Sequence, residues 1–482
     1  MQTSNKNIGF RGGLVTAARL AAVLVALVAA GGTTSSSQTA TLPPYEVFRS
    51  RPDLRPPTVQ ILRPASTAHR TASGYLFIGP KRRAVQAGPM IFDNRGNLVW
   101  FRPLRTRGVT DLRVQRYRGR PVLTWWQARP TGATHGSAFY KIADRSYRTL
   151  AVVRPGAGAT ADPHEFLLTA RGTALMTTFR GTRVGGRRVI EGGVQEIDLR
   201  TGRVLFDWGS VDHVAVGESY AKPPKNPSVL YDYFHINSID VDTDGNLLVS
   251  ARNTHAVYKI HHRTGRVLWR LGGKRSDYSL GPGVRFAWQH DARRQPDRTI
   301  SVFDNGAAPR RHDQSRVLFL HLSRETRKAR LVRRVIHRPS ILAINQGNAQ
   351  RLANGDLLVG WGHTPYVTEY DKRGRVVLDL RFGRRADTYR AYRFPWIGRP
   401  LTKPAVAVHR GRVFVSWNGA TEVARWQILA GRSARHLQPF RTVPKRGFET
   451  PAAISPDLPW ISVRALDRTG RALGTSRTIH AH

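Results

Sequence analysis

The chain has 482 residues and no cysteine, so disulfides and thiolate metal sites cannot stabilise it. Its 77 Lys and Arg against 32 Asp and Glu give a formal net charge of +45, which would ordinarily raise nucleic acid as a partner. The arginines are scattered through every segment without a helix-turn-helix, zinc-finger or RRM-like signature, so we expect no nucleic-acid partner but a solvated basic surface, with anionic small substrates or an anionic cell envelope nearby.

The N-terminus has the pattern of a secretory signal. Lys6 and Arg11 precede an apolar, alanine-rich stretch over 12–30, and a polar Ser/Thr run follows over 31–40. Arg19 leaves only residues 20–30 uninterrupted, which is short for a membrane span of about 20 apolar residues. We predict that residues 1–40 are a signal peptide and linker and that the protein is exported, either secreted or associated with the cell envelope. A cleaved signal is favoured over a retained anchor.

One pattern of three short strands separated by Gly, Asn or Asp/Thr-Gly turns recurs after the linker. The clearest copy covers 244–273, with close relatives within 171–209 and 354–383. Weaker copies cover 73–101, 119–153 and 297–335. Fixed-period repetition of strands is typical of radial architectures, so residues 41–400 are predicted to form an all-β, six-bladed β-propeller. A two-sheet sandwich or a β-helix is the alternative.

The pattern changes over 401–482. Two strands around Trp417 and Trp426 are followed by a hairpin through Asp467 to Gly470. We predict a small fibronectin type III-like β-sandwich, with a propeller-closing segment and an extra hairpin as the alternative.

Polar residues stand about ten to twelve positions before the Leu-Leu-Val-like strand of successive repeats. They are Asp111, His164, His235, His290 and the Asn345 to Asn348 segment. Equivalent positions in successive propeller blades converge on one central funnel, so we expect the three histidines to face one another there. A second register just after that strand holds Arg180, Arg252 and Asn305.

Other histidines and the tryptophans are assigned lesser roles. His255, His261, His262 and His312 fall in turns or outer strands and are expected at the surface, while His363 is a second-rank pocket candidate. Trp125, Trp126 and Trp361 either wall an aromatic substrate site or, as is more usual at strand ends, pack between blades. Because the P-loop, G-x-G-x-x-G, H-E-x-x-H and G-x-S-x-G signatures are missing, nucleotide-dependent and serine-hydrolase chemistry are disfavoured.

Several segments carry a family resemblance: MIFDNRGNLVWF, DPHEFLLTARGTAL, FHINSIDVDTDGNLLVSARNTHAVYKI, WQHDAR and SVFDNG. Through them most of the chain after the linker resembles the bacterial arylsulfotransferase family that does not use an adenosine-phosphosulfate donor. The resemblance implies an aryl-sulfate:phenol sulfotransferase that takes a sulfuryl group from a small phenolic sulfate donor to a phenol acceptor. By motif, His290 would be the nucleophile that becomes transiently sulfated.

The resemblance also assigns the substrate-binding residues. His235 and Arg252 would hold the sulfuryl oxygens, and His164 would be a further contact. Asn305 is placed in the same substrate pocket, and it and Asp291 are the candidates for orienting the nucleophile. Neither a cofactor nor a metal is expected. The chain departs from some relatives in having no cysteine, in its C-terminal module and in the Asp-Ala-Arg-Arg that follows His290.

Two other functions stay open on sequence grounds. Three converging histidines could bind a divalent ion in a metal-dependent propeller lyase or hydrolase, although Arg252 in the pocket argues against a bare cation site. The other alternative is a non-catalytic, envelope-associated propeller in which the funnel and the sandwich module bind a glycan or another anionic polymer.

Overall fold

The computed structural model describes residues 43–66, 70–81, 84–106, 108–128, 138–383 and 386–481. These residues form strands almost throughout, with two short 3₁₀ helices at Ser210–Asp212 and Val216–Glu218. The all-β prediction is therefore confirmed. No helix in the described ranges is long and apolar enough to cross a membrane. The predicted signal peptide and linker lie outside them.

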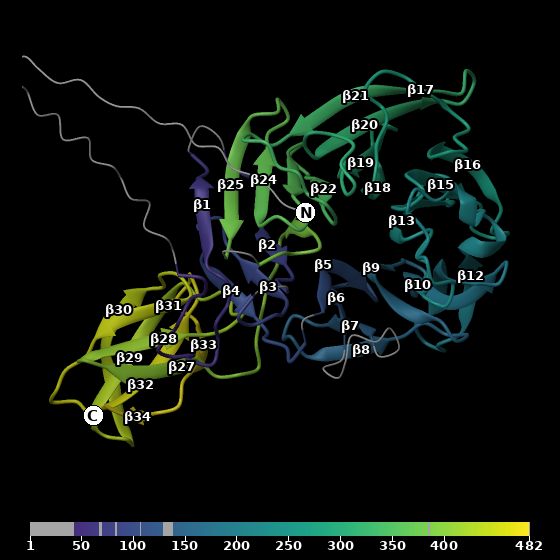
Figure 1. The fold of residues 1–482 in the computed structure, drawn as a ribbon. Coiled ribbons are helices and arrows are strands. Elements are labelled where there is room, and N and C mark those ends of the chain that lie inside the picture. The colour runs from purple at the N-terminus through teal and green to yellow at the C-terminus, as the bar shows by residue number, and fades with distance from the viewer. Residues whose placement is uncertain are drawn as a thin grey trace, which may run out of the picture. The chain divides into compact units, whose positions relative to one another are not determined.

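Six mainly antiparallel sheets follow one another along the chain (Figure 1). The first three are β5 (Val109–Tyr117), β6 (Arg120–Gln127), β7 (Phe139–Ala143) and β8 (Thr149–Val153); β9 (Thr160–Leu168), β10 (Thr173–Val184), β11 (Arg187–Asp198) and β12 (Val204–Gly209); and β13 (Ile236–Val241), β14 (Leu247–Ala251), β15 (Ala256–Ile260) and β16 (Val267–Gly272).

The next three sheets complete the series. They are β18 (His290–Arg294), β19 (Ile300–Asp304), β20 (Arg316–Ser323) and β21 (Lys328–Ile336), with β17 (Ser279–Leu280) parallel to β21; β22 (Asn348–Arg351), β23 (Leu357–Gly360), β24 (Tyr366–Tyr370) and β25 (Val376–Phe382), with β1 (Val59–Arg63) on β25; and β26 (Ala391–Phe394), β2 (Tyr75–Ile78), β3 (Met90–Phe92) and β4 (Leu98–Phe101).

The sheets are joined in a closed order by their inner strands, which we define as β5, β9, β13, β18, β22 and β26. Each inner strand contacts the next, and β26 contacts β5. Strand β26 comes late in the chain yet pairs with β2, through Tyr75↔Phe394 to Ile78↔Ala391. The sheet that contains the first repeat is therefore completed by residues far along the sequence.

Local sequence explains the outer strands. In the repeat at 244–273, β14 and β15 are buried along their whole length and consist largely of aliphatic and β-branched residues. Gly245 and Gly265 have φ of +78° and +74° at the turns that follow Asp244 and Thr264, a conformation that glycine adopts without strain.

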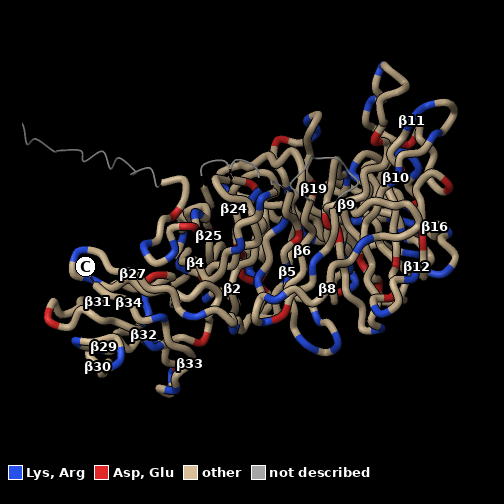
Figure 2. Tube along the Cα trace, turned by 90° about the horizontal axis from the view of Figure 1, so that it is seen from below, with Lys and Arg blue, Asp and Glu red and all other residues tan. Residues whose placement is uncertain are grey.

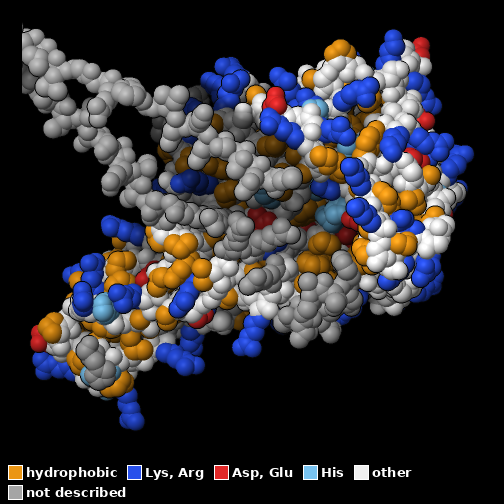
Figure 3. Space-filling view, viewed as in Figure 1, with side chains coloured by type: hydrophobic (Ala, Val, Ile, Leu, Met, Phe, Trp, Pro, Cys, Tyr) orange, Lys and Arg blue, Asp and Glu red, His pale blue; other side chains and the backbone are white. Residues whose placement is uncertain are grey.

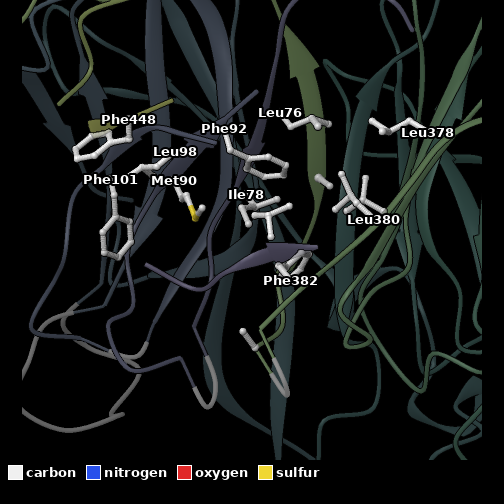
Figure 4. Close-up of a cluster of buried hydrophobic side chains, with 14 of the residues drawn as sticks. Leu76, Ile78, Met90, Phe92, Leu98, Phe101, Leu378, Leu380, Phe382 and Phe448 are labelled. Atoms are coloured by element: carbon white, nitrogen blue, oxygen red, sulfur yellow. The ribbon is translucent and has the colours of Figure 1, made fainter. Parts of the chain in front are cut away.

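Buried apolar side chains fill the space between neighbouring sheets. In one cluster, Phe92 and Ile78 pack against Leu378 and Leu380 of the adjoining sheet (Figure 4). Phe448, from beyond residue 401, joins the same cluster. The C-terminal part thus packs against the sheets that come before it.

The C-terminal strands form two further sheets. One contains β27 (Ala405–His409), β28 (Arg412–Ser416) and β31 (Glu449–Ala453), and the other contains β29 (Arg425–Ser433), β30 (His436–Pro444), β32 (Trp460–Leu466), β33 (Ala472–Thr475) and β34 (Ile479–His480). They enclose a core of their own that includes Trp417 and Trp426. Asn418 fixes them to β4, because its side chain accepts from the Phe101 amide at 3.0 Å and donates to the Phe101 carbonyl at 2.8 Å.

A buried ionic network links the inner strands. It contains three arginines and three carboxylates, namely Arg113, Arg293, Arg390, Asp111, Glu165 and Asp291. Arg390 pairs with Asp111 and Glu165, each at 3.0 Å. Burial alone would raise the pKa of Glu165, but Arg113, Arg293 and Arg390 hold that pKa well below its usual value.

The network also reaches β13, β22 and β26, the three inner strands that supply none of its charges; the Tyr392 hydroxyl of β26 donates to Asp111 at 3.2 Å. Arg293 donates to the Ile239 carbonyl of β13 at 2.6 Å, and the Asp291 carboxylate accepts from the Ala349 amide of β22 at 3.0 Å. All six inner strands are therefore connected through it.

Replacement of Arg390 by methionine should destabilise the fold strongly. The change leaves a buried excess of carboxylate charge, which typically costs roughly 3–5 kcal/mol of unfolding free energy. Urea unfolding followed by tryptophan fluorescence measures the loss. Arg399→Met, which breaks the exposed Arg399 and Glu422 pair, is the matched control and should shift the midpoint far less. Equal shifts in the two variants would contradict the role given to the network.

Candidate functional site

The predicted histidines lie in or directly before three consecutive inner strands. His164 is in β9, His235 directly precedes β13, and His290 opens β18. The strand pairing is irregular there, with register shifts between Ile236 and Ser238 and between His290 and Arg293, and His235 has a φ of +54°. Bulges of this kind turn side chains out of the regular alternation and are frequent beside active sites.

The three histidines come together around a tyrosine. The ring centroids of His164 and His235 are 5.1 Å apart, and Tyr389 lies 5.2 Å from His164 and 6.3 Å from His290. Tyr389 is itself fixed, because its hydroxyl donates to the Asn237 carbonyl at 2.7 Å. Histidine side chains are visible near the middle of the face in Figure 3, with Lys and Arg close to them.

Arg252 adds a cation to this group. Its guanidinium carbon lies 4.9 Å from the ring centroid of Trp288, two residues before His290. The positive charge of Arg252 contributes to lowering the pKa of His290, as do His164 and His235. The structure therefore brings His164, His235, Arg252 and His290 to one place.

Hydrogen bonds fix the tautomer of His290. Asn305 donates its amide N–H groups to the carbonyls of Ala343 at 2.8 Å and Gln346 at 2.9 Å. Its Oδ1 is left to accept from His290 Nδ1 at 2.7 Å. Nδ1 therefore carries the proton, and Nε2 has a lone pair that accepts the Gln346 amide N–H at 3.2 Å.

The surroundings of His290 keep it neutral. The side chain is buried, with 1% of its surface exposed. Burial is the largest cause of a pKa held well below the usual value, followed by the charge of Arg252, while the hydrogen bond to Asn305 opposes the shift. A neutral imidazole with its lone pair on Nε2 is the form that can act as a nucleophile once the Gln346 N–H gives way.

The other two histidines have carboxylate partners instead. His164 Nδ1 lies 2.5 Å from Asp162 Oδ1, and His235 Nδ1 is hydrogen-bonded to Asp232 Oδ2. Burial would raise the pKa of Asp232, but His235, with smaller contributions from His164 and Arg252, lowers that pKa, so this carboxylate is ionised. Each carboxylate orients its imidazole through Nδ1, which leaves Nε2 for a ligand.

Sequence analysis did not find Asp162 and Asp232. The only signal was their spacing, two residues before His164 in DPH and three before His235 in DYFH. Tyr389 was missed as well, because it precedes the last inner strand and no repeat pattern points to it.

Several other residues of the two predicted registers have structural partners. Asp111 belongs to the ionic network, Arg180 pairs with Asp207 at 2.6 Å, and Asn348 donates to the Ala391 carbonyl at 2.8 Å. Asn305, predicted to bind substrate or to orient the nucleophile, lies behind His290 with no exposed surface. Asp291, the other candidate orienter, is engaged by Arg293 and Arg390.

Trp125 and Trp361 are fully buried in the cores between sheets, so they pack rather than wall a pocket. His363 lies beside the segment that carries Gln346, where its Nδ1 accepts the Ile344 amide at 3.1 Å.

The surface assignment of His255 is wrong. This imidazole is 6% exposed, stacks on Tyr220 with ring centroids 4.1 Å apart, and meets the edge of Trp288 at 4.4 Å. The cause is the connection between β12 and β13, which folds back so that the Tyr220 amide donates to the Asn253 carbonyl at 2.7 Å. The turn pattern of the sequence around His255 cannot show that a segment from elsewhere in the chain buries this side chain.

The fold is all-β, and at its inner strands it brings together a buried neutral imidazole, two further histidines and the guanidinium of Arg252. Within the described ranges, no three His, Asp or Glu side chains form a group that could hold a metal ion. A model of the arylsulfotransferase (ASST) family matches residues 113–383, more than half of the chain. The chain belongs to the arylsulfotransferase family, and the match contains all five predicted site residues.

Other known proteins add little. No curated protein matches the chain. Among solved structures, it is similar to a protein of unknown function from Bacteroides caccae, with 16% identity, a TM-score of 0.42, and coverage of 67% of this chain and 100% of that one.

It is also similar to a catalytically inactive virginiamycin B lyase from Staphylococcus aureus, with 10% identity, a TM-score of 0.34, and coverage of 75% and 97%. The extracellular domain of the hybrid two-component system BT3049 from B. thetaiotaomicron has 11% identity, a TM-score of 0.36, and coverage of 89% and 57%. Likenesses this weak carry no argument about this chain.

The hydrogen bonds of His290 predict its behaviour in solution. At pH 6.5, where an ordinary imidazole is about half protonated, His290 should remain neutral with the proton on Nδ1, because its pKa lies well below that value. Nitrogen-15 NMR of imidazole-labelled protein measures both properties, and the signals are assigned by their loss in His290→Asn. An imidazolium signal at this position at pH 6.5 would show that burial does not keep His290 neutral.

Proposed function

We propose that the protein is an aryl-sulfate:phenol sulfotransferase that works through a sulfohistidine intermediate on His290. The observation that carries the proposal is the buried, neutral His290, whose tautomer is fixed by Asn305 and which is surrounded by Arg252, His164 and His235. Membership of the arylsulfotransferase family supports an aryl sulfate donor and a phenol acceptor. The reaction needs no cofactor.

The first half-reaction forms the sulfohistidine. The Nε2 lone pair of His290 attacks the sulfur of the aryl sulfate, an N–S bond forms, the bond from sulfur to the aryl oxygen breaks, and the phenolate leaves with the bonding electron pair. Sulfuryl transfer resembles phosphoryl transfer in its loose transition state, with charge on the peripheral oxygens. Arg252, His235 and His164 stabilise that charge, which is the largest contribution such a site can make.

The second half-reaction restores the enzyme. The oxygen of the acceptor phenol attacks sulfur, the N–S bond breaks, and the electron pair returns to Nε2 while the phenol proton passes to solvent. The Gln346 N–H donates to Nε2 before the reaction, so this hydrogen bond must break when the N–S bond forms. A sulfuryl oxygen on the same nitrogen can then accept from the Gln346 N–H. Asn305 holds both partners of this exchange, since it bonds His290 and the Gln346 carbonyl.

The architecture fits this role. We infer that the closed order of six sheets over residues 41–400 is a six-bladed β-propeller, and that residues 401–482 are a fibronectin type III-like sandwich. Support comes from the contacts among the inner strands and from the separate C-terminal core. We also propose that residues 1–40 direct export, so that the enzyme acts outside the cytoplasm.

Phenol release from 4-nitrophenyl sulfate, with and without a second phenol as acceptor, tests the proposal. The wild-type protein should show turnover that depends on the acceptor and is insensitive to a chelator. His290→Asn should lose at least about a thousandfold in kcat, because it removes the nucleophile. His436→Asn, at an exposed position of β30, is the matched control and should retain full activity.

Two results would contradict the proposal. Turnover that a chelator abolishes would indicate metal-dependent chemistry instead. Folded wild-type protein without turnover would favour a non-catalytic protein that binds an anionic polymer.

A further inference from the structure

A two-stranded ribbon extends β10 and β11 beyond the rest of their sheet. The two strands pair from Thr173↔Asp198 to Val184↔Arg187. Strand β9 accompanies β10 only as far as Phe179, and β12 accompanies β11 only as far as Gly193. Figure 2 shows the hairpin reaching past the neighbouring strands, with Lys and Arg near its tip. It leaves the sheet at the end where β9 begins, and Asp162 and His164 are the third and fifth residues of that strand.

A third segment, residues 219–231, contacts this ribbon through its second part, residues 224–231. The Tyr231 amide donates to the Arg188 carbonyl at 3.0 Å, and the Ile190 amide donates to the Tyr231 carbonyl at 2.9 Å. We call residues 181–190 together with 219–231 the basic arm. Asp232 is the next residue along the chain and His235 follows three later, so the arm is continuous with the candidate site.

The charge of the arm is uncompensated. It carries five cations, Arg183, Arg187, Arg188, Lys222 and Lys225, and its two segments contain no Asp or Glu. The three arginines donate to carbonyl oxygens, of Gly186, Pro224 and Ser228 respectively. None of the five cations forms an ion pair with a described residue, whereas exposed arginines elsewhere, such as Arg310 and Arg375, pair with nearby aspartates.

The arm is also held in one shape. Its tip is a two-residue turn in which Gly185 and Gly186 have φ of +53° and +77°, the conformation that tight hairpins require. Three prolines stiffen the 219–231 segment. Val184 and Val229 are exposed among the cations, at 39% and 51%. A rigid surface that combines charge with a few apolar contacts loses little conformational entropy on binding.

We propose that the basic arm binds acidic polymers that bear phenol groups, such as acidic polypeptides containing tyrosine, and that these are acceptors for the candidate site. The inference rests on the proposed function. A polymer held along the arm places its phenols next to Asp232 and His235. Opposite charge concentrates such an acceptor at the site, and salt weakens the effect.

A random copolymer of glutamate and tyrosine is the acceptor that tests this proposal, with 4-nitrophenyl sulfate as donor. The wild-type protein should have a lower KM, per tyrosine, for this copolymer than for a lysine and tyrosine copolymer, and the preference should fall as salt is added. The variant combines Arg183→Glu, Lys222→Glu and Lys225→Glu, which leaves the arginine contacts to Pro224 and Ser228 in place. Its KM for the acidic copolymer should rise at least about tenfold, and its kcat with a small phenol should stay within about twofold of wild type.

A second triple variant controls for net charge. Arg432→Glu, Arg435→Glu and Arg441→Glu change three exposed cations of β29, β30 and their connecting turn, with the same change in total charge. Its KM for the acidic copolymer should stay near the wild-type value. An equal rise in both triple variants would overturn the proposal, since the overall charge and not the arm would then determine affinity.

Binding separates this inference from the proposed function. If no acceptor supports turnover, the sulfotransferase proposal fails, and binding of acidic polymers by the arm is then tested by fluorescence anisotropy with labelled polyglutamate. Binding that is lost in the arm variant but kept in the control variant supports the binding role of the arm independently of catalysis. Wild-type protein that does not bind polyglutamate, or that binds vesicles of anionic phospholipid far more tightly through the arm, overturns the assignment to acidic polymers.

Discussion

The ionic network among the inner strands is the interaction on which the site depends. Its charges are buried away from water, and the free-energy cost of burying each one is offset by the opposite charges beside it. Breaking one pair leaves a charge that the protein interior cannot solvate. The members come from β5, β9, β18 and the residue before β26, with further hydrogen bonds to β13 and β22. The geometry of all six strands is therefore coupled through a single set of contacts.

That set lies one residue away from the candidate site at three points. Glu165 follows His164, Asp291 follows His290, and Arg390 follows Tyr389. Neighbouring residues of an extended chain point in different directions, so one side chain of each pair enters the network and the other faces the site. The network thus orders the backbone from which the histidines project, and the hydrogen-bond partners then set their chemistry. A neutral amide holds the proposed nucleophile, and ionised or hydrogen-bonded carboxylates hold the other two imidazoles.

The sequence predicted the outer strands well, since β14 to β16 and their counterparts consist mainly of aliphatic, β-branched and aromatic residues between glycine turns. The inner strands are harder to recognise. They carry polar and charged residues and are interrupted by bulges, as in HDARR of β18, so their pattern resembles a loop. The common register of His164, His235 and His290 nevertheless revealed the position of the inner strands. Residues at equivalent positions of successive repeats lie close together where the inner strands meet.

What the sequence could not show depends on contacts across the fold. Tyr389 contacts His164 and His290 only because β26 pairs with β2, near the beginning of the folded chain. His255 is buried by the connection between β12 and β13, which has no periodic pattern. Asp162 and Asp232 need the irregular backbone at the strand entrances to reach their histidines.

The late position of β26 has a consequence for how the protein is made. During synthesis the first repeat emerges early, but its sheet has no inner strand until residues 391–394 have followed it. Tyr389 and Arg390 arrive with that strand, so closing the order of sheets, completing the ionic network and assembling the histidine site become one event. Contacts between residues so distant along the chain form slowly, because a long loop must close first. A chain that stops short of this strand can bury several cores yet lacks a finished site, so the histidine site can form only after synthesis has passed residue 394.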